Sequence, residues 1–378
     1  MGSPFQFGKT AQGSAFTNRI KEIQRLSNNI ENNIHTILIS PRRWGKTSLI
    51  KKVAQKYINK QQYKFCFLDL FNVRSENDFY EYLAIEVIKS TSTKVEEWFK
   101  ITQTFLSKIS PKLSMSAGTD TDFSIQFDIQ ENDRSIFEIL NLTEKISKRK
   151  KIRIILCIDE FQNIETFKDP LGFQQKLRAQ WQHHQHVTYC LYGSKRHMLM
   201  NLFESQSLPF YKFGDVMYLE KIAKKDFTKF IVKNFEQTNK SIPVAVAEKL
   251  VDLMECHPHY VQHLAHITWK NSKKKVTEAI LDQSKDELLY VNSLLFEKIF
   301  ELLSNGQIKL LKALTDGINE HFSSKDVINK YGLGTSANVA KMLKALENKE
   351  IIDRFGTELS FVDPPFRLWL TEIFKKYK

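Results

Sequence analysis

Cysteine and long apolar runs are what this 378-residue sequence has least of. Three of its four cysteines, Cys66, Cys157 and Cys190, lie in strand-like runs and Cys256 stands alone, a spacing that fits neither a disulfide framework nor a metal site. No apolar stretch approaches the roughly 18 residues that span a bilayer, and the N-terminal residues lack the apolar core of a signal peptide. We therefore expect buried free thiols in a cytoplasmic protein with no membrane partner.

Repeats and low-complexity tracts are also missing. Hydrophobic residues make up 42% of the sequence and charged residues 26%, which is ordinary for a globular protein and excludes a fibrous or disordered chain. A chain of this length accommodates two or three domains with sizeable cores.

Positive charge is in excess, with a formal net charge of +13. A basic protein invites an interpretation as a nucleic-acid binder. However, residues 291–378 carry 13 basic and 11 acidic side chains, a net charge of +2, and the densest basic runs are Lys148–Lys151 and Lys273–Lys275. Such runs occur at solvated helix ends more often than in binding patches, so the charge alone leaves both interpretations open.

The most informative segment is Ile37–Leu49, ILISPRRWGKTSL, which predicts a buried strand, a phosphate-binding loop and a helix in succession. Gly45 lets the backbone curl so that amide groups point at phosphate oxygens, and the helix that begins near Lys46 directs its positive dipole end there. We expect Lys46 to reach the β- and γ-phosphates and the Thr47 hydroxyl to bind Mg²⁺. The segment therefore predicts binding of a nucleoside triphosphate.

Ser40 stands where the usual loop spacing has its first glycine. It can form the turn if its φ stays negative, whereas a positive φ would cost about 1 kcal/mol or more. Arg42 and Arg43 either contact phosphate or pair with acids of a lid or a neighbouring subunit, and both alternatives stay open. The predicted nucleotide-binding residues of the loop are Ser40, Pro41, Arg42, Arg43, Trp44, Gly45, Lys46, Thr47 and Ser48.

A second apolar run, Ile152–Glu160, ends in two acids. Its β-branched composition predicts a buried parallel strand, and ligands of open α/β sheets lie at the carboxyl ends of such strands. Together with the phosphate-binding loop, the two acids look like a Walker B motif. Asp159 would hold Mg²⁺ through water, and Glu160 would position or deprotonate the attacking water. Alternatively, the acids only cap the next helix.

Strands and helices are expected to alternate around these two motifs. Strands are predicted at 64–72 and 187–192, and helices at 76–106, 136–148, 170–182 and through 224–269. Alternating residues on both sides of a break at Gly118 predict a hairpin inserted at about 112–128. His183, His184 and His186 cluster beside a helix end, where we expect a solvated helix terminus and not a set of zinc ligands.

Several segments together resemble one family. The loop SPRRWGKTSL, the strands ending IDEFQ and YGSKR, the helical segment HPHYVQHL and the closing DPPFRLWL look like the archaeal-type ATPases of the STAND class, relatives of the AAA+ and origin-recognition ATPases. The resemblance covers nearly the whole chain and implies an ATPase core followed by a helical lid. In that family the loop normally begins Gly-Pro-Arg-Arg, where this sequence has Ser40.

The resemblance also implies roles for residues outside the loop. FTNR is similar to the family's Phe-Val-Gly-Arg element beside the adenine, with Asn18 in place of glycine, and implies a nucleotide contact from Arg19. His257-Pro258 is similar to the Gly-His-Pro motif that closes over the nucleotide, with Cys256 in place of glycine, and implies a contact from Pro258.

Ser194 lies at the family's sensor-strand position, from which a hydroxyl can detect the γ-phosphate or orient water. Arg196 can act as an arginine supplied in cis, neutralising charge that develops on phosphoryl transfer. The alternative is that Gly193-Ser194 form a turn and that Lys195-Arg196 lie on the surface. The predicted catalytic residues are Glu160, Lys46, Ser194 and Arg196, and the predicted metal ligands are Thr47 and Asp159.

The C-terminal residues have the pattern of a winged helix-turn-helix. Helices are predicted at 306–314, 323–331 and 335–348, followed by a hairpin at 351–361 that turns at Gly356. If this module binds DNA, its third helix presents Ser336, Asn338, Lys341 and Lys344 to the major groove, and Arg354 in the wing touches phosphate. If it does not, it packs on the ATPase as a regulatory or partner-docking domain. The charge of +2 favours the second alternative, because counterion release needs clustered positive charge.

The predicted fold is α/β: a parallel-sheet P-loop NTPase core at 1–215, a helical lid at 216–290 and a winged helix-turn-helix domain at 291–378. With ATP and Mg²⁺ as ligands, we expect an ATPase that acts as a nucleotide-controlled switch. The alternatives are an ATP-regulated DNA-binding protein, similar to origin-recognition proteins, and a partner-docking regulatory module with little turnover. A protein partner or self-association is also expected.

Overall fold

The computed structural model describes residues 2–92, 95–106, 111–115, 123–127 and 133–376. The chain divides into two compact units. We call Arg19–Arg42 with Lys46–Glu220 the core unit, and Met1–Asn18, Arg43–Gly45 and Lys221–Lys378 the lid unit. Three residues of the predicted phosphate-binding loop therefore group with the lid unit.

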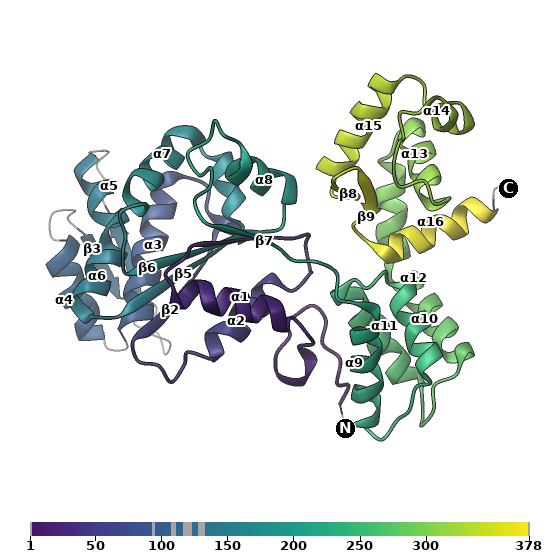
Figure 1. Cartoon of the computed structure of the whole chain (residues 1–378), viewed down its shortest axis with the longest axis horizontal. Coiled ribbons are helices and arrows are strands. Elements are labelled where there is room, and N and C mark those ends of the chain that lie inside the picture. Colours follow the sequence, from purple (N-terminus) through teal and green to yellow (C-terminus); the bar gives the residue numbers. More distant parts are fainter. Residues whose placement is uncertain (1, 93–94, 107–110, 116–122, 128–132, 377–378) are drawn as a thin grey trace. The chain divides into compact units, whose positions relative to one another are not determined.

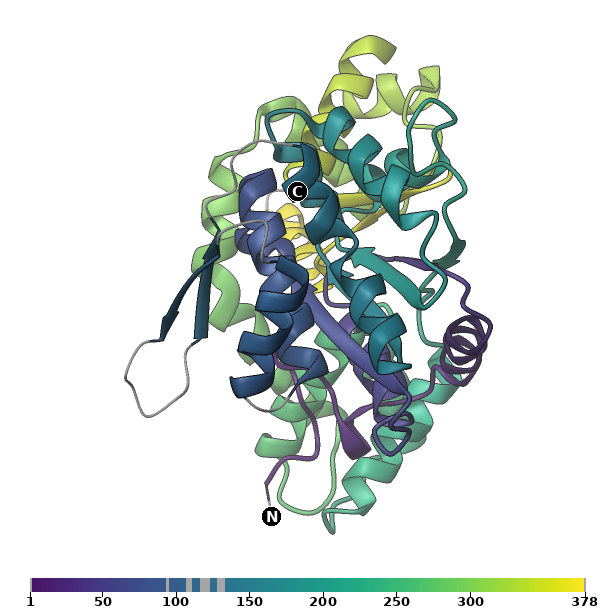
Figure 2. The ribbon, with the colours of Figure 1, turned by 90° about the vertical axis from the view of Figure 1, so that its left-hand side faces the viewer.

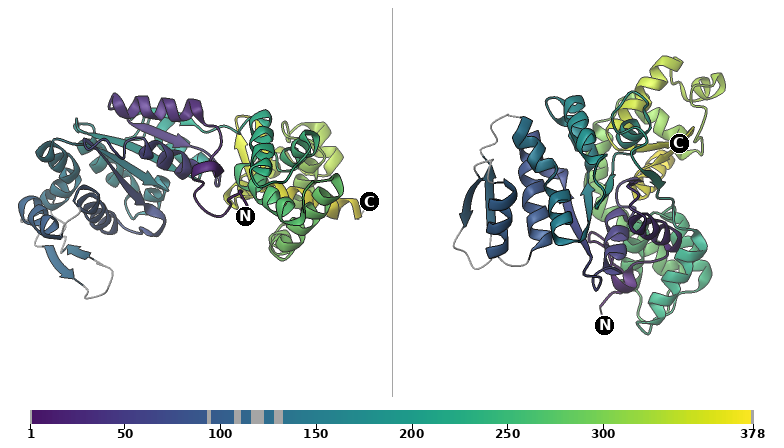
Figure 3. Two further views of the ribbon diagram at one scale, coloured as in Figure 1. Left: turned by 90° about the horizontal axis from the view of Figure 1, so that it is seen from below. Right: turned by 60° about the vertical axis from the view of Figure 1, so that its left-hand side comes forward.

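The core unit is built around a five-stranded sheet in the order β2-β5-β6-β1-β7, in which all neighbouring strands are parallel. Helices cover both faces of this sheet (Figures 1 and 3). For that reason β6 is buried at every position, as expected for a parallel strand between two helical layers. The strands are β1 (Thr36–Ile39), β2 (Tyr63–Asp69), β5 (Arg153–Asp159), β6 (Val187–Gly193) and β7 (Asp215–Tyr218).

Capping residues define where several core helices begin. Ser75 and Asp78 form a reciprocal capping box at α3, and the Asp169 side chain accepts from the Gly172 amide at α7, whose first residue is Pro170. The core helices are α1 (Ile20–Glu31), α2 (Lys46–Gln55), α3 (Glu76–Thr91), α4 (Val95–Leu106), α5 (Asp133–Leu140), α6 (Leu142–Lys150), α7 (Pro170–Trp181) and α8 (Arg196–Glu204).

The region in which the sequence predicts a hairpin holds β3 (Pro111–Met115) and β4 (Phe123–Phe127). The two strands pair antiparallel, with Leu113 opposite Ile125. Figure 2 shows this ribbon at the margin of the core unit, outside the main sheet.

One predicted strand boundary needs correction, and one strand was missed. The strand predicted at 64–72 ends at Asp69, because the Asp69 side chain accepts a hydrogen bond from the Phe71 amide and Leu70–Asn72 turn into a 3-10 helix. The edge strand β7 was not predicted at all. It has only four residues and, within the described part of the chain, pairs only with β1, so its sequence carries little alternation to recognise.

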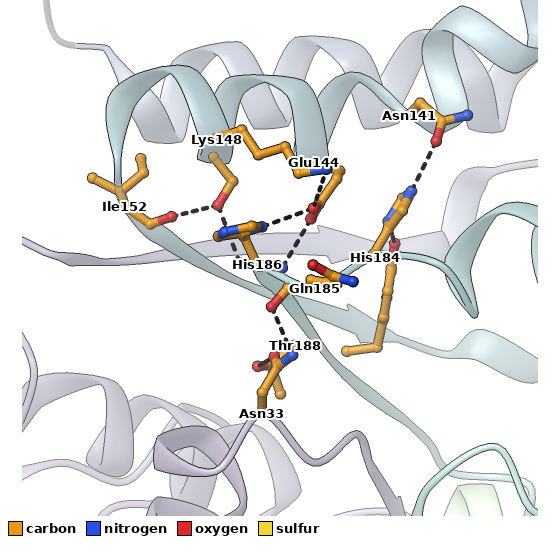
Figure 4. A network of polar contacts seen from close by, with 11 residues as sticks. Asn33, Asn141, Glu144, Lys148, Ile152, His184, Gln185, His186 and Thr188 are labelled. Carbon is orange, nitrogen blue, oxygen red and sulfur yellow. Dashed lines mark hydrogen bonds and ion pairs between the residues drawn. The ribbon is translucent and has the colours of Figure 1, made fainter.

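The solvated helix end expected after α7 holds for His183, which is exposed, but not for His184, which is buried in a network of polar contacts that Figure 4 shows. His184 is only 6% exposed, and its Nδ1 and Nε2 lie 2.6 Å and 3.1 Å from Tyr189 Oη and Asn141 Oδ1. His186 Nδ1 lies 2.8 Å from Glu144 Oε1. Burial lowers the pKa of His184 to about 4, so a neutral ring ties the beginning of β6 to the α5–α6 junction. Asn141 and Glu144 lie more than 40 residues before these histidines, which is why the pattern missed them.

The predicted free thiols are present: Cys66, Cys157 and Cys190 are buried, whereas Cys256 is only partly buried. Within the described part of the chain, no helix combines the length and apolar character needed to cross a bilayer.

The lid unit contains two hydrophobic clusters. The first joins the lid helices α9 (Lys224–Glu236), α10 (Val244–Leu253), α11 (Pro258–Asn271) and the beginning of α12 (Glu278–Glu301), and it includes Phe5 of the N-terminal segment. The second holds the winged helix together. Its elements are α13 (Asn305–Thr315), α14 (Lys325–Tyr331), α15 (Ser336–Asn348), β8 (Ile352–Phe355), β9 (Glu358–Phe361) and α16 (Pro364–Lys376). The hairpin turns through Gly356 at a φ of 61°, a left-handed conformation that suits glycine.

Candidate nucleotide-binding site

The predicted loop leaves the sheet at the end of β1, where Ser40 is fully buried. Ser40 keeps a negative φ, and the left-handed positions of the loop are Arg43 (φ 63°) and Gly45 (φ 92°). Serine in place of the family's first glycine therefore adds no backbone strain. The Ser40 hydroxyl donates to the Pro41 carbonyl at 3.2 Å.

Lys46, the first residue of α2, is 6% exposed and folds back over the loop. Its Nζ donates to the carbonyl oxygens of Ser40 and Pro41 at 3.1 Å and 2.9 Å. Burial lowers the pKa of Lys46 to about 8, against the opposing effect of Glu160 and Asp159. An ammonium whose partners here are neutral carbonyls would be stabilised further by an anionic ligand such as phosphate.

Thr47 and Asp159 meet at the carboxyl end of β5. Thr47 Oγ1 donates to Asp159 Oδ2 at 2.9 Å, and the Glu160 amide donates to Asp159 Oδ1 at 2.9 Å. Burial, and next the neighbouring charge of Glu160, raise the pKa of Asp159 to about 6. A hydroxyl beside two crowded carboxyl groups is an oxygen donor set that suits Mg²⁺, and a cation here would relieve the repulsion between the acids.

The Glu160 side chain is fixed by the turn after β6. Its Oε2 accepts from the Ser194 amide at 3.2 Å, from the Ser194 hydroxyl at 3.0 Å and from Gln162 Nε2. The absence of a side chain at Gly193 lets Gln162 and the Glu160 backbone pack against the turn. A Cβ at Gly193 would lie 1.9 Å from Gln162 Oε1 and 3.3 Å from Glu160 Cα. Sequence reasoning gave Gln162 no role, although the IDEFQ segment that contains it was singled out.

Arg196, the first residue of α8, is 8% exposed, whereas Lys195 is exposed. The surface alternative considered for this pair therefore fits Lys195 and not Arg196. The positive charge of Arg196 is close enough to contribute to the lowered pKa of Lys46, whereas the acids Glu160 and Asp159 oppose that lowering.

In the lid unit, loop residue Arg43 takes part in a hydrogen-bond chain. Arg43 Nη1 donates to Tyr260 Oη at 3.0 Å, and Tyr260 Oη donates to Asp363 Oδ2 at 2.6 Å. Asp363 Oδ1 also accepts from the Phe366 amide at 3.3 Å, which caps α16. Burial raises the pKa of Asp363, although its hydrogen bonds and Arg43 oppose the rise. Sequence reasoning assigned no role to Tyr260 or Asp363, because only the fold joins HPHY, DPPF and the loop.

Trp44 also belongs to the lid unit, where its ring lies edge-to-face with His257 at 6.1 Å between centroids. Burial lowers the pKa of His257 to about 3, so this ring is neutral. The next residue, Pro258, begins α11. Cys256 has a φ of 57°, which is a left-handed conformation at the position where the resembled family has glycine.

The predicted adenine-side residues are also in left-handed conformations, with φ values of 55° for Asn18 and 67° for Arg19. Arg19 is 5% exposed, and its Nη1 donates to Glu22 Oε1 at 2.9 Å and to the Glu220 carbonyl at 2.6 Å. Of the remaining predicted loop residues, Arg42 is exposed and Ser48 is buried in α2.

Family comparison places these motifs within two matched regions. Residues 16–264 match the family described as an ATPase domain predominantly from Archaea, and residues 294–372 match a probable winged helix domain. The first region spans more than half of the chain and includes the loop, both acids and the sensor-strand serine. Among proteins with curated descriptions, none matches this sequence.

Solved structures with the same fold cover nearly the whole chain. The Walker-type ATPase PABY2304 of Pyrococcus abyssi aligns with a TM-score of 0.67 at 16% identity, covering 97% of this chain and 99% of its own. The ORC2 protein of Aeropyrum pernix, in ADPNP-ADP complexes, aligns with a TM-score of 0.58 at 12% identity, covering 99% and 98%. At these identities the likeness shows the fold: a P-loop NTPase core with a C-terminal winged helix, as predicted.

Proposed function

Because the chain belongs to the family of ATPase domains found predominantly in Archaea, we propose that it binds ATP with Mg²⁺ and hydrolyses it as a nucleotide-controlled switch. The observation that carries this proposal is the convergence of Lys46, Thr47, Asp159, Glu160 and Ser194 at the carboxyl ends of three adjacent strands, β5, β6 and β1. In open α/β sheets this edge is where ligands bind.

The proposed roles follow from the contacts. Lys46 would exchange its bonds to loop carbonyls for bonds to phosphate oxygens, the Thr47 hydroxyl would bind Mg²⁺, and Asp159 would hold the ion through water. Bound Mg²⁺ would supply charge neutralisation on the phosphates. Glu160 accepts a proton from the attacking water, while Ser194 and Gln162 hold its carboxylate in place.

Further residues complete the proposed site. Arg196 would neutralise charge that develops during phosphoryl transfer, and Arg42, Trp44 and Ser48 would line the phosphate side. Arg19 and Pro258 would contact the nucleotide at the adenine and lid, as the resemblance implies.

The switch role is supported by the chain Arg43–Tyr260–Asp363. Arg43 lies within the phosphate-binding loop, Tyr260 lies on α11 of the lid, and Asp363 caps the last helix of the winged-helix region. A change in the loop on nucleotide binding or hydrolysis would therefore reach the lid and the C-terminal region through two hydrogen bonds. We infer that these contacts report the nucleotide state to the rest of the lid unit.

Substitution of Lys46 tests the proposal. A Lys46→Ala protein should bind ATP at least about 100-fold more weakly in titration calorimetry, because a buried charge-assisted contact to phosphate is lost. Lys52→Ala, in the same helix α2, is the matched control and should retain wild-type affinity. Unchanged ATP affinity of the Lys46→Ala protein would overturn the proposal.

DNA binding by the winged helix is a second candidate. Ser336, Asn338, Lys341 and Lys344 of α15 are all exposed, as a reading helix requires. Against this candidate, Arg354 of the wing forms an ion pair with Glu347 at 2.6 Å, which competes with a contact to DNA phosphate. The near balance of charge also leaves little counterion release to drive binding.

This candidate predicts salt-dependent duplex binding that is lost when Lys341 and Lys344 are both changed to alanine. Changing Lys325 and Lys330 on α14 removes the same charge and serves as the control. Equal losses of DNA affinity in the two double variants would indicate non-specific electrostatic attraction only. If the double change of Lys341 and Lys344 leaves DNA affinity unchanged, α15 is excluded as the reading helix.

We also propose three functional domains along the sequence: an ATPase core at 1–215, a lid at 216–290 and a winged helix at 291–378. The two compact units are divided differently, since residues 1–18 and 43–45 group with the lid unit. The cytoplasm is the proposed location, and a protein partner the proposed recipient of the signal.

A further inference from the structure

Helix α12 connects the lid to the winged helix, and one side of it is firmly packed. Leu281 and Leu288 belong to the hydrophobic cluster of the lid, while Leu289 and Phe296 belong to that of the winged helix. The helix is continuous over 24 residues, so both clusters hold a single rigid rod on its inner side.

The opposite side of α12 is apolar and open to water. Tyr290, Val291, Leu294 and Leu295 are 81%, 67%, 73% and 54% exposed, and Leu302 just beyond the helix is 74% exposed. Residues at these spacings share one face of a helix. These five are among thirteen large apolar side chains exposed within the described residues, and the other eight are scattered along the chain. A contiguous apolar face of this kind is typical of an interaction surface.

We propose that this face is the contact surface of a homodimer in which two α12 helices pack antiparallel about a two-fold axis. The face consists of Tyr290, Val291, Leu294 and Leu295, with Glu287 and Lys298 at its ends. The evidence is that the residues of the face are placed symmetrically about the midpoint between Asn292 and Ser293. Tyr290 then lies opposite Leu295 of the second copy, and Val291 lies opposite Leu294. An isologous dimer requires such self-complementarity.

The charged ends of the face follow the same symmetry. Glu287 and Lys298 are equally distant from the midpoint, so the antiparallel arrangement places each Glu287 against the second copy's Lys298. A parallel arrangement would instead oppose like charges at both ends. Glu287 is only 33% exposed, and its carboxylate accepts from Lys270 Nζ and from Asn271 Nδ2, so its position is fixed before the second copy arrives.

One helix face from each subunit is a small contact compared with stable complexes, which bury about 1,200 Å² or more in total. We therefore expect a dimer that dissociates in about the micromolar range, whose formation depends on concentration. The proposal rests on α12 alone and is independent of the proposed function of the nucleotide site.

Sedimentation equilibrium of the full chain without nucleotide, over about 1–200 μM, tests the dimer. Leu294→Glu places a carboxylate in the centre of the face and should weaken dimerisation at least about tenfold. Val244→Glu, at a 57% exposed apolar residue of α10, is the matched control and should have no effect. A wild-type chain that stays monomeric, as it would if its own core unit covered the face, overturns the proposal. So does a dimer that Leu294→Glu leaves intact.

A mixing experiment tests the antiparallel register. Lys298→Glu and Glu287→Lys should each weaken self-association about tenfold, because like charges then meet at both ends. In an equimolar mixture, each end of the heterodimer again joins opposite charges, so association should return to within about threefold of wild type. Failure of the mixture to associate, with both variants folded by circular dichroism, overturns the register.

Discussion

Two polar clusters of this molecule are built in opposite ways. The acids of the core unit lie in short motifs at strand ends, and parallel strands bring Thr47, Asp159 and Ser194 to one edge of the sheet. The chain Arg43–Tyr260–Asp363 has one hydrogen bond at each step and joins the phosphate-binding loop to α11 and to the beginning of α16. The first arrangement concentrates charge where chemistry can occur, and the second connects distant parts. We expect variants in the first to change turnover, and variants in the second to change the response to nucleotide.

The largest effect is expected in the core cluster, from Glu160→Gln. Loss of a general base should lower ATP hydrolysis at least about 100-fold while ATP affinity stays within about threefold, measured by phosphate release and calorimetry. Glu165→Gln, a nearby acid whose carboxylate accepts from Gln174, is the control and should hydrolyse ATP normally. Undiminished hydrolysis by Glu160→Gln would remove Glu160 from the mechanism. Tight nucleotide retention with negligible wild-type turnover would favour a switch over a steady enzyme.

The next largest effect is a change in stability caused by Asp159 of the core cluster. The pKa of Asp159 rises from 3.8 to about 6, so ionisation costs the folded state on the order of 2–3 kcal/mol at pH 7. A raised carboxyl pKa means that stability is lost as the pH rises from about 4 to 6. Asp159→Asn should therefore raise the free energy of unfolding of the nucleotide-free protein by about 1–3 kcal/mol at pH 7, a gain that shrinks toward pH 4.

Denaturant unfolding at several pH values measures this gain. Asp252→Asn is the control, since Asp252 is 56% exposed in its ion pair with Lys224, and its effect should stay below about 0.5 kcal/mol. A less stable Asp159→Asn protein at pH 7 would contradict the prediction. The same variant should bind Mg-ATP more weakly, which would separate function from stability at this position.

The long-range chain predicts a smaller effect. Tyr260→Phe keeps the ring but removes the hydroxyl between Arg43 and Asp363, leaving a buried carboxylate with one partner fewer. ATP affinity should fall about three- to tenfold with hydrolysis at saturating ATP unchanged. Tyr331→Phe, which removes a Tyr–Asp hydrogen bond within the winged helix, is the matched control. If both variants bind ATP like wild type, the chain does not communicate with the loop.

The smallest effect is expected at the three positions where the resembled family has glycine. Cys256→Gly should raise the free energy of unfolding by about 1 kcal/mol, because Cys256 has a φ of 57°. Asn18→Gly should gain less, since asparagine tolerates left-handed backbone and glycine would lose the hydrogen bond that Asn18 Nδ2 donates to Asp226 Oδ2 at 2.7 Å. Ser40→Gly should gain nothing, because Ser40 keeps a negative φ. Thermal melts of the three variants provide the test, and stabilisation by Ser40→Gly would contradict the argument.

The sequence predicted well what depends on local pattern. The strand before the loop, the acid-ending strand β5, strand β6, and the three helices and hairpin of the winged helix all lie near their predicted residues. Each has a strong apolar period or a capping signal, such as the Ser324 and Thr335 side chains that cap α14 and α15.

Long-range contacts and short edge strands could not be predicted from the sequence. Burial of His184 depends on Asn141 and Tyr189, and the fixed position of Glu160 depends on Gln162 and the bare backbone of Gly193. Such partnerships follow from packing and leave no periodic signal.

The position of β1 in the sheet limits where movement can begin. This strand is hydrogen-bonded along both edges, to β6 and to β7, and all four of its residues are buried. A shift along its axis would break two ladders at once, so the strand acts as a fixed support. Between β1 and α2, displacement caused by a ligand should therefore start after Ile39, in the few residues before α2, where binding free energy can be converted into movement of the loop.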